Sequence, residues 1–292
     1  MRTVILSCFA MLAFAGNSVL CRLALADQQI DPATFTSVRL VAGAMMLVLI
    51  VLMRRTTSIE GSTPSGLRKS FFSAAMLFAY ALFFSYAYID LDTATGALVL
   101  FGIVQITLIG IGIAKGKTLH SFEWLGLAIA CGGFVFLLLP ELNTPTLSGL
   151  LMMAIAGIAW GVYTALGQGS VQPLIDTKTN FVLSVPMVFI LVLICAAFGL
   201  TTGASSKGII LAVISGAITS ALGYAIWYAV LPKLDTTVAA VIQLSVPVIA
   251  AILGLLLVNE VPSLHLIVSG LTILLGIFLV IITRNRIVQN QT

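Results

Sequence analysis

Charged residues are scarce in this 292-residue sequence. Only 8% of the residues are Asp, Glu, Lys or Arg, while 60% are hydrophobic and the mean hydropathy is +1.16. A soluble domain carries roughly 25% charged residues, so this chain has too little polar surface to cover itself in water. The P-loop, the dinucleotide-binding fingerprint and the H-E-x-x-H zinc motif are also missing. Their absence argues against an ATP-driven pump.

Cysteine is scarce as well. Its four copies fall inside apolar segments, without C-x-x-C spacing and without a neighbouring histidine cluster. We interpret them as small core residues, and the sequence predicts no disulfide, metal site or cofactor. They are Cys8, Cys21, Cys131 and Cys195.

Long apolar runs fill most of the chain. About 20 such residues span a hydrocarbon core of about 30 Å, and little length is left for a soluble domain. The first run follows Arg2 as a signal peptide would, but it continues to Leu25 at full spanning length. We therefore expect ten transmembrane helices. They are predicted at 4–25, 33–53, 70–89, 93–114, 122–139, 147–167, 177–199, 208–231, 236–258 and 264–283.

Lysine and arginine separate cleanly between alternate loops. Because positive residues accumulate on the cytoplasmic side, both termini are expected in the cytoplasm of a cell inner membrane. A missed helix would mix the two groups, so the separation favours an even number of helices. One side receives Arg2, Arg54, Arg55, Arg68, Lys69, Lys115, Lys117, Lys178, Lys233, Arg284 and Arg286, and the other receives Lys207.

The two halves of the chain resemble each other. The stretch AFAGNSVLCRLAL at 13–25 aligns with AIAGIAWGVYTAL at 154–166, and Leu-Asp-Thr at 91–93 aligns with the same residues at 234–236. An odd number of helices per half gives the halves opposite orientations. The expected fold is therefore all-α and integral to the membrane, with inverted five-helix repeats at 1–143 and 144–292.

Several local motifs accompany this pattern. They are Phe14-Ala15-Gly16-Asn17 in the first helix, Arg39 in FTSVRLVAGAMM, Trp160 in the aligned helix of the second half, and the run from Pro247 to Glu260. Over the whole chain they resemble the EamA-type exporters of the drug/metabolite transporter superfamily. The first half departs from the pattern, since it has no proline near Gln105 and carries Lys117 at the position aligned with Glu260.

The resemblance implies export of amino acids or related metabolites, with the aromatic amino-acid exporters as a neighbouring branch. Two alternatives from the same superfamily are an exporter of drugs and one of nucleotide-like metabolites. A membrane-embedded enzyme would need paired aspartates or a His-rich cluster within the spans, and a channel would need repeated filter motifs. The sequence contains neither, so no catalytic residue is predicted.

Apart from Glu123 and Lys178, each at the second residue of its span, the charged residues within the predicted spans are Arg22 and Arg39. Such charges cost about 2.5 to 3.5 kcal/mol each on insertion scales and suggest a function. Snorkelling to the interface explains Arg22 equally well. Arg39 lies deeper, where it could bind a substrate carboxylate or hold helices together through backbone carbonyls.

Uncharged polar and aromatic residues near the middle of the membrane are the better candidates for a substrate site. A cavity for a zwitterion needs hydrogen-bonding groups between apolar walls, although interhelical packing uses the same residue types. With Arg39, the predicted substrate-binding residues are Asn17, Tyr80, Gln105, Trp160, Tyr163, Tyr224, Trp227 and Gln243.

The predicted motion and coupling follow from other residues. Pro186 and Pro247 fall inside predicted helices, where proline removes a hydrogen bond, and are hinge candidates. No Asp or Glu lies in the middle of a predicted span, which favours facilitated diffusion or exchange over proton coupling. Glu260, His120 and His265 lie at loop boundaries and are interpreted as structural.

The expected partners are a small-molecule substrate and membrane lipid. The net charge of +4 is spread over short loops without a basic face, so no nucleic-acid partner is predicted. The oligomeric state is left open by the sequence.

Overall fold

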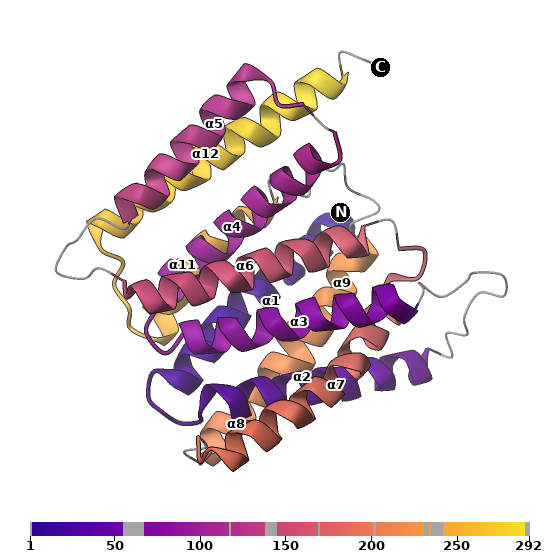
Figure 1. Cartoon of the computed structure of the whole chain (residues 1–292). Coiled ribbons are helices and arrows are strands. Elements are labelled where there is room, and N and C mark those ends of the chain that lie inside the picture. The colour runs from indigo at the N-terminus through magenta and orange to yellow at the C-terminus, as the bar shows by residue number, and fades with distance from the viewer. Residues whose placement is uncertain are drawn as a thin grey trace.

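The chain folds into helices in a computed structural model (Figure 1). It describes residues 2–54, 67–116, 118–137, 145–168, 170–200, 203–230, 234 and 242–289. Within these ranges the only β-type pairing is an isolated bridge between Ile30 and Ala204. The helices are α1 (Arg2–Leu25), α2 (Pro32–Met53), α3 (Leu67–Ala87), α4 (Thr93–Ala114), α5 (Ser121–Leu137), α6 (Leu147–Gly167), α7 (Pro173–Ala197), α8 (Ser206–Ile214), η1 (Ser215–Leu222), α9 (Gly223–Val230), α11 (Ser245–Leu257) and α12 (Leu264–Gln289).

The helices α8, η1 and α9 follow one another without a break and form a single rod. The described residues therefore make ten helical rods, of which eight are long and apolar enough to cross a membrane. The other two, α5 and α11, are shorter apolar helices. The prediction of an all-helical membrane protein with ten spans is confirmed. The tenth helix runs past its predicted end at 283 to Gln289.

Helix starts follow from capping chemistry. Asp31 accepts a hydrogen bond from the backbone N–H of Thr34 at 2.9 Å, and Pro32 occupies the first position of α2. Thr146 and Ser205 cap α6 and α8 in the same way. A side-chain oxygen at the N-cap accepts from a backbone N–H that has no partner within the helix. Each of these helices therefore begins directly after such a residue.

The outer surface of the bundle is apolar, as a lipid-facing surface must be. Phe189, Ile190 and Leu193 of α7 are more than half exposed. A soluble protein rarely exposes such a continuous apolar face. The polar and aromatic residues of the predicted site, by contrast, are buried in the middle of the bundle.

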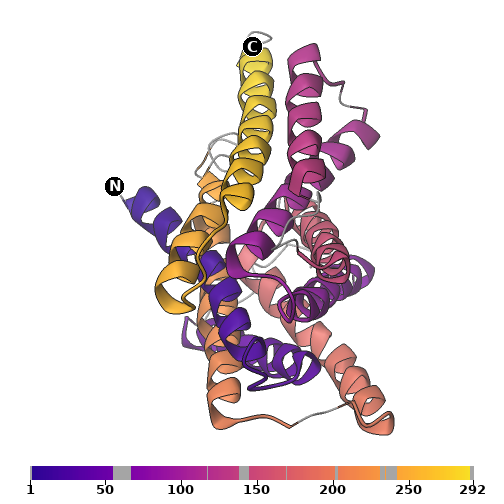
Figure 2. The same ribbon diagram turned by 90° about the vertical axis from the view of Figure 1, so that its left-hand side faces the viewer.

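Numbered from one to ten along the chain, the rods form two sets of five. Nearly the same pairs of rods remain in contact when each rod is exchanged with the one five places away. The pair α3 and α6 then becomes the rod of α8 to α9 with α1, and α4 with α6 becomes α11 with α1. The pairs α2 with α7, α4 with α11 and α5 with α12 map onto themselves. In both views α5 and α12 run side by side and stand apart from the other rods (Figures 1 and 2).

In Figure 1 the start of α1 and the end of α12 both lie towards the right-hand end of the bundle. We call this the terminal end. The opposite end carries the turns from α1 to α2, from α3 to α4 and from α11 to α12, and we call it the distal end. Arg55, Lys117, Glu141, Lys233 and the repeat residues 235–236 lie outside the described ranges.

Two expectations need correction. The eighth helix is not a uniform α-helix, because η1 in its middle is a π-helix. Both prolines lie in helical segments: Pro186 is inside α7, and Pro247 is in the first turn of α11, just after the helical residues 242–243. Only two of the four cysteines are core residues: Cys21 and Cys195 are buried, while Cys8 and Cys131 are exposed, and all four are free.

Candidate functional site

Aromatic rings from both halves of the chain meet at the centre of the bundle. The Trp160 ring centroid lies 4.7 Å from that of Tyr80 and 4.8 Å from that of Tyr224. Phe14 packs edge-on against Trp160, Tyr224 and Trp227, with centroid distances of 5.7 to 6.4 Å. These are favourable distances for tilted and edge-to-face aromatic pairs. Helices α1, α3, α6 and α9 therefore share one aromatic cluster.

A small cavity lies within this cluster. Its volume is about 10 Å³, close to the minimum that one water molecule needs. It cannot hold an amino acid in this conformation. The lining residues are Phe14, Asn17, Tyr80, Phe84, Leu100, Phe101, Trp160 and Tyr224.

Arg39 is buried beside the cluster with only 1% of its surface exposed. Its Nε donates to Ser220 Oγ at 3.1 Å, and its Nη2 donates to the Tyr80 hydroxyl at 3.0 Å. Its Cζ lies 5.2 Å and 5.0 Å from the ring centroids of Tyr80 and Phe84, within cation–π range. Its Nη1 is buried and has no hydrogen-bond partner among the described residues.

No carboxylate of the described part of the chain forms an ion pair with Arg39. The three ion pairs there involve Arg22 twice and Lys207 once. A buried guanidinium normally has an acidic partner because burying a lone charge is costly. Arg39 is instead stabilised by two hydroxyls and two aromatic rings, which leaves one nitrogen and the full positive charge for another group.

Asn17 holds the other side of this hydrogen-bond network. Its side-chain oxygen accepts bonds from the hydroxyls of Ser215, Thr219 and Ser220, at 2.9 Å for Ser215 and 3.2 Å for Ser220. Ser220 therefore accepts from Arg39 and donates to Asn17. The network joins α1, α2 and η1.

The π-helical turn explains how one amide oxygen can meet three hydroxyls. In an α-helix of about 3.6 residues per turn, residues five apart face different sides. The i→i+5 bonds of a π-helix bring such residues onto one face, as with Ser215 and Ser220 of η1. Short π-helical segments occur often at functional sites. The turn also packs Gly216 directly against the backbone carbonyl of Arg39.

The remaining predicted residues are divided between the cluster and its surroundings. The Tyr163 ring is tilted against that of Trp160, with 5.3 Å between their centroids, and its hydroxyl accepts from Asn180 at 3.4 Å. Gln105 and Gln243 are buried, but neither lines the central cavity. Gln243 lies just before α11.

Sequence reasoning missed several residues of the site. Phe14, Phe84 and Phe101 line the cavity, but phenylalanine in a transmembrane helix is too common to stand out. Ser220 was missed because its role depends on the π-helical turn. The hydroxyl-rich stretch SGAITSAL was the available signal.

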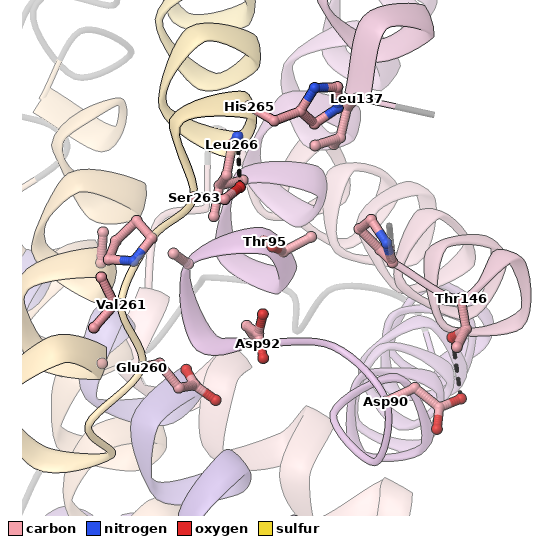
Figure 3. A pocket seen from close by; sticks show the side chains of 15 residues that line it. Asp90, Asp92, Thr95, Leu137, Thr146, Glu260, Val261, Ser263, His265 and Leu266 are labelled. Atoms are coloured by element: carbon pink, nitrogen blue, oxygen red, sulfur yellow. Dashed lines mark hydrogen bonds between the residues drawn. The ribbon is translucent and has the colours of Figure 1, made fainter. Parts of the chain in front are cut away.

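A second hollow lies at the distal end and has a volume of about 240 Å³. Figure 3 shows Asp92 and Glu260 in its wall, Asp90 bonded to Thr146, and His265 beside Leu137. All three acids have polar partners: Asp90 accepts from Thr146, and Asp92 and Glu260 contact Arg22. Within the described ranges no group of three His, Cys, Asp or Glu residues is placed to hold a metal ion.

Arg22 joins the helices around this hollow. Its Nε donates to Glu260 at 2.7 Å, its Nη2 contacts Asp92 at 3.4 Å, and its Nη1 donates to the carbonyls of Tyr88 and Ile89. The other oxygen of Glu260 accepts from the first backbone N–H of α4. We call Arg22, Asp92 and Glu260 the distal latch, because they tie α1 and the end of α11 to the start of α4. Arg22 is thus engaged in ion pairing, and Glu260 has a defined structural role.

The latch alters the acidity of one member. Partial burial, and then the neighbouring Glu260 carboxylate, raise the pKa of Asp92, while Arg22 acts in the opposite direction. Asp92 therefore takes up a proton at a higher pH than an ordinary aspartate. The latch loses charge as the pH falls.

In the part of the chain that the structure describes, ten apolar helical rods pack around a buried cluster of aromatic and polar side chains, as in a multi-span membrane protein. The EamA-like transporter family model matches residues 1–139 and 147–282. The chain belongs to this family and is a membrane transporter.

Three relatives match this chain over most of its length. The chain is 45% identical to an uncharacterized protein of Pseudomonas aeruginosa, covering 97% of this chain and 96% of the relative. It is 23% identical to an uncharacterized transporter of Archaeoglobus fulgidus, covering 95% and 96%, and 22% identical to the uncharacterized transporter YoaV of Bacillus subtilis, covering 88% and 89%. A solved crystal structure at 17% identity has the same fold, with a TM-score of 0.65 and 96% of each chain covered.

Proposed function

We propose that this transporter exports amino acids or similar small metabolites that carry a carboxylate, by facilitated diffusion or exchange. The observation that carries the proposal is Arg39, a buried positive charge without an acidic partner among the described residues. A substrate carboxylate would satisfy Nη1 and neutralise the charge. The aromatic rings beside it would pack on the rest of the substrate.

The small size of the central cavity supports a mechanism of alternating access. A site that is closed in one state must open to bind, and in inverted-repeat transporters it opens to each side in turn. We propose that residues 1–143 and 144–292 form two inverted five-helix repeats that exchange conformations. The repeated sequence offset and the exchangeable packing of the rods support this division.

The proposed orientation places both termini in the cytoplasm of the cell inner membrane. The distal latch then lies on the outer side, and the charge bias of the loops supports this placement. The proposed site residues are those predicted from the sequence, with Asn17, Arg39, Tyr80, Trp160 and Tyr224 as its centre. Pro186, inside α7, and Pro247, at the start of α11, remain the proposed hinge residues.

Export of drugs or nucleotide-like metabolites is the nearest alternative, since aromatic rings also stack on planar heterocycles. A membrane-embedded enzyme is a more distant one. It would need an acid–base or metal group beside a bound substrate, and the central cluster offers amides, hydroxyls, rings and a guanidinium.

Uptake into liposomes tests the proposal. The purified chain would be reconstituted and offered labelled aromatic, aliphatic and small polar amino acids, with and without a proton gradient. We expect saturable flux without the gradient, and a preference for aromatic side chains. Absence of flux for every amino acid would remove the substrate assignment, and flux that requires the gradient would contradict the facilitative mechanism.

A further inference from the structure

Arg39 can serve a substrate only if its guanidinium is held in one place, and Ser220 is placed to hold it. The Ser220 hydroxyl accepts from Arg39 Nε and donates to Asn17. Its proton is committed to Asn17, so its lone pair faces Arg39. Ser220 is 1% exposed and Asn17 is 2% exposed, which keeps competing water away.

The orientation of Ser220 depends on the π-helical turn. Ser215, five residues before Ser220, also donates to Asn17. Only a π-helix sets both of these hydroxyls on one face. A regular α-helix through this segment would turn one of them away. The turn is therefore coupled to the position of the Arg39 guanidinium.

We propose that Ser220, held by Asn17 on the π-helical turn of η1, is a positioning residue that orients Arg39 so that Nη1 stays available to a substrate carboxylate. Tyr80 fixes the guanidinium through Nη2. Ser220 fixes Nε, and the two bonds together define the plane of the group. The inference rests on the proposed function, because it assigns Ser220 a role in binding the carboxylate.

The experiment compares Ser220→Ala with Ser269→Ala in proteoliposomes of the full chain. Ser269 is a matched control, because its hydroxyl is also fully buried but bonds to the carbonyl of His265 in its own helix α12. The probes are labelled L-phenylalanine and, as a competitor without the carboxylate, L-phenylalaninamide. Ser220→Thr keeps the hydroxyl and serves as the rescue variant.

Loss of one hydrogen bond to a charged group should raise the KM for L-phenylalanine about tenfold in Ser220→Ala. The inhibition constant of the amide should change much less, because it lacks the group that Arg39 binds. Ser269→Ala and Ser220→Thr should match the wild type. A merely structural role for Ser220 would shift both constants together, and that result would overturn the proposal.

The experiment separates failure of the positioning role of Ser220 from failure of the proposed transport function. If wild-type protein carries L-phenylalanine but Ser220→Ala behaves like Ser269→Ala, the positioning role is wrong and the proposed function stands. If the wild type shows no saturable flux of L-phenylalanine or any other amino acid, the proposed function fails, and the inference that rests on it is overturned too.

Discussion

At the scale of single residues, the site is defined by what surrounds Arg39. A lone buried arginine is expensive within a membrane, and hydroxyls and rings only partly replace an acidic partner. Two hydrogen bonds and two aromatic faces stabilise its charge without cancelling it. The residue thus combines structural bonds with an unsatisfied donor.

The Trp160 ring packs against the rings of both Tyr80 and Tyr224. We predict that Trp160→Ala enlarges the central cavity, lowers the stability by about 3 kcal/mol or more, and weakens the preference for aromatic amino acids. Trp124→Ala is the matched control, since that ring is 57% exposed. Thermal unfolding in detergent and the liposome panel measure both effects. Equal selectivity in the two variants would exclude Trp160 from the site.

At the scale of elements, the contact between α2 and η1 leaves no room for a side chain at one position. A Cβ added to Gly216 would overlap the backbone carbonyl oxygen of Arg39. We predict that Gly216→Ala separates the two elements and costs about 1 to 3 kcal/mol. Gly110→Ala in α4 is the control, because nothing lies within 4 Å of its added carbon.

Thermal unfolding in detergent checks this pair of variants. Gly110→Ala should not lower the midpoint, since alanine is the better helix former. A loss of stability in Gly110→Ala equal to that in Gly216→Ala would contradict the close contact between α2 and η1.

The elements also show what the sequence could predict. Hydropathy and caps placed most of the rods to within four residues at the ends that the structure describes, because apolar length and turn residues are local properties. The predicted start of the ninth helix, at 236–241, lies outside the described residues. The π-helical turn was not predictable, since it depends on the fit of Ser215 and Ser220 to Asn17 in another helix. The convergence of Asn17, Tyr80, Trp160 and Tyr224 was expected, whereas the participation of Phe14 and Ser220 required the packing.

At the scale of the whole molecule, the distal latch ties the two halves of the chain together at one end. Arg22 lies in the first half and Glu260 in the second, and their 2.7 Å ion pair is only partly exposed. The residue aligned with Arg22 in the second half is Tyr163, which makes a neutral hydrogen bond to Asn180. Among the described residues, a neutral hydrogen bond therefore stands in the second half where the first half has an ion pair.

We predict that Arg22→Gln opens the distal end. A cysteine placed at Thr95, which lines the distal hollow, should react with a maleimide about fivefold faster in this variant, in a background without the native cysteines. An ion pair of about 1 kcal/mol corresponds to such a factor. Because closure of the latch raises the pKa of Asp92, protonation of Asp92 favours the closed end. Lowering the pH should therefore slow the labelling in the wild type by more than the loss of thiolate alone accounts for.

Lys207→Gln provides the control for this prediction. It removes the exposed pair with Asp27 at 3.8 Å, at the same end of the molecule, and should leave the labelling rate unchanged. Equal rates in wild type, Arg22→Gln and Lys207→Gln would show that the latch does not hold the distal end closed.

The central claim, that this transporter binds a substrate carboxylate through Arg39, is tested most directly by Arg39→Gln in proteoliposomes. Arg68→Gln, at an exposed position of α3, is the matched control for a lost arginine. We predict that Arg39→Gln raises the KM for L-phenylalanine by about tenfold or more and leaves competition by L-phenylalaninamide much less affected. An unchanged KM in folded Arg39→Gln protein would contradict the account.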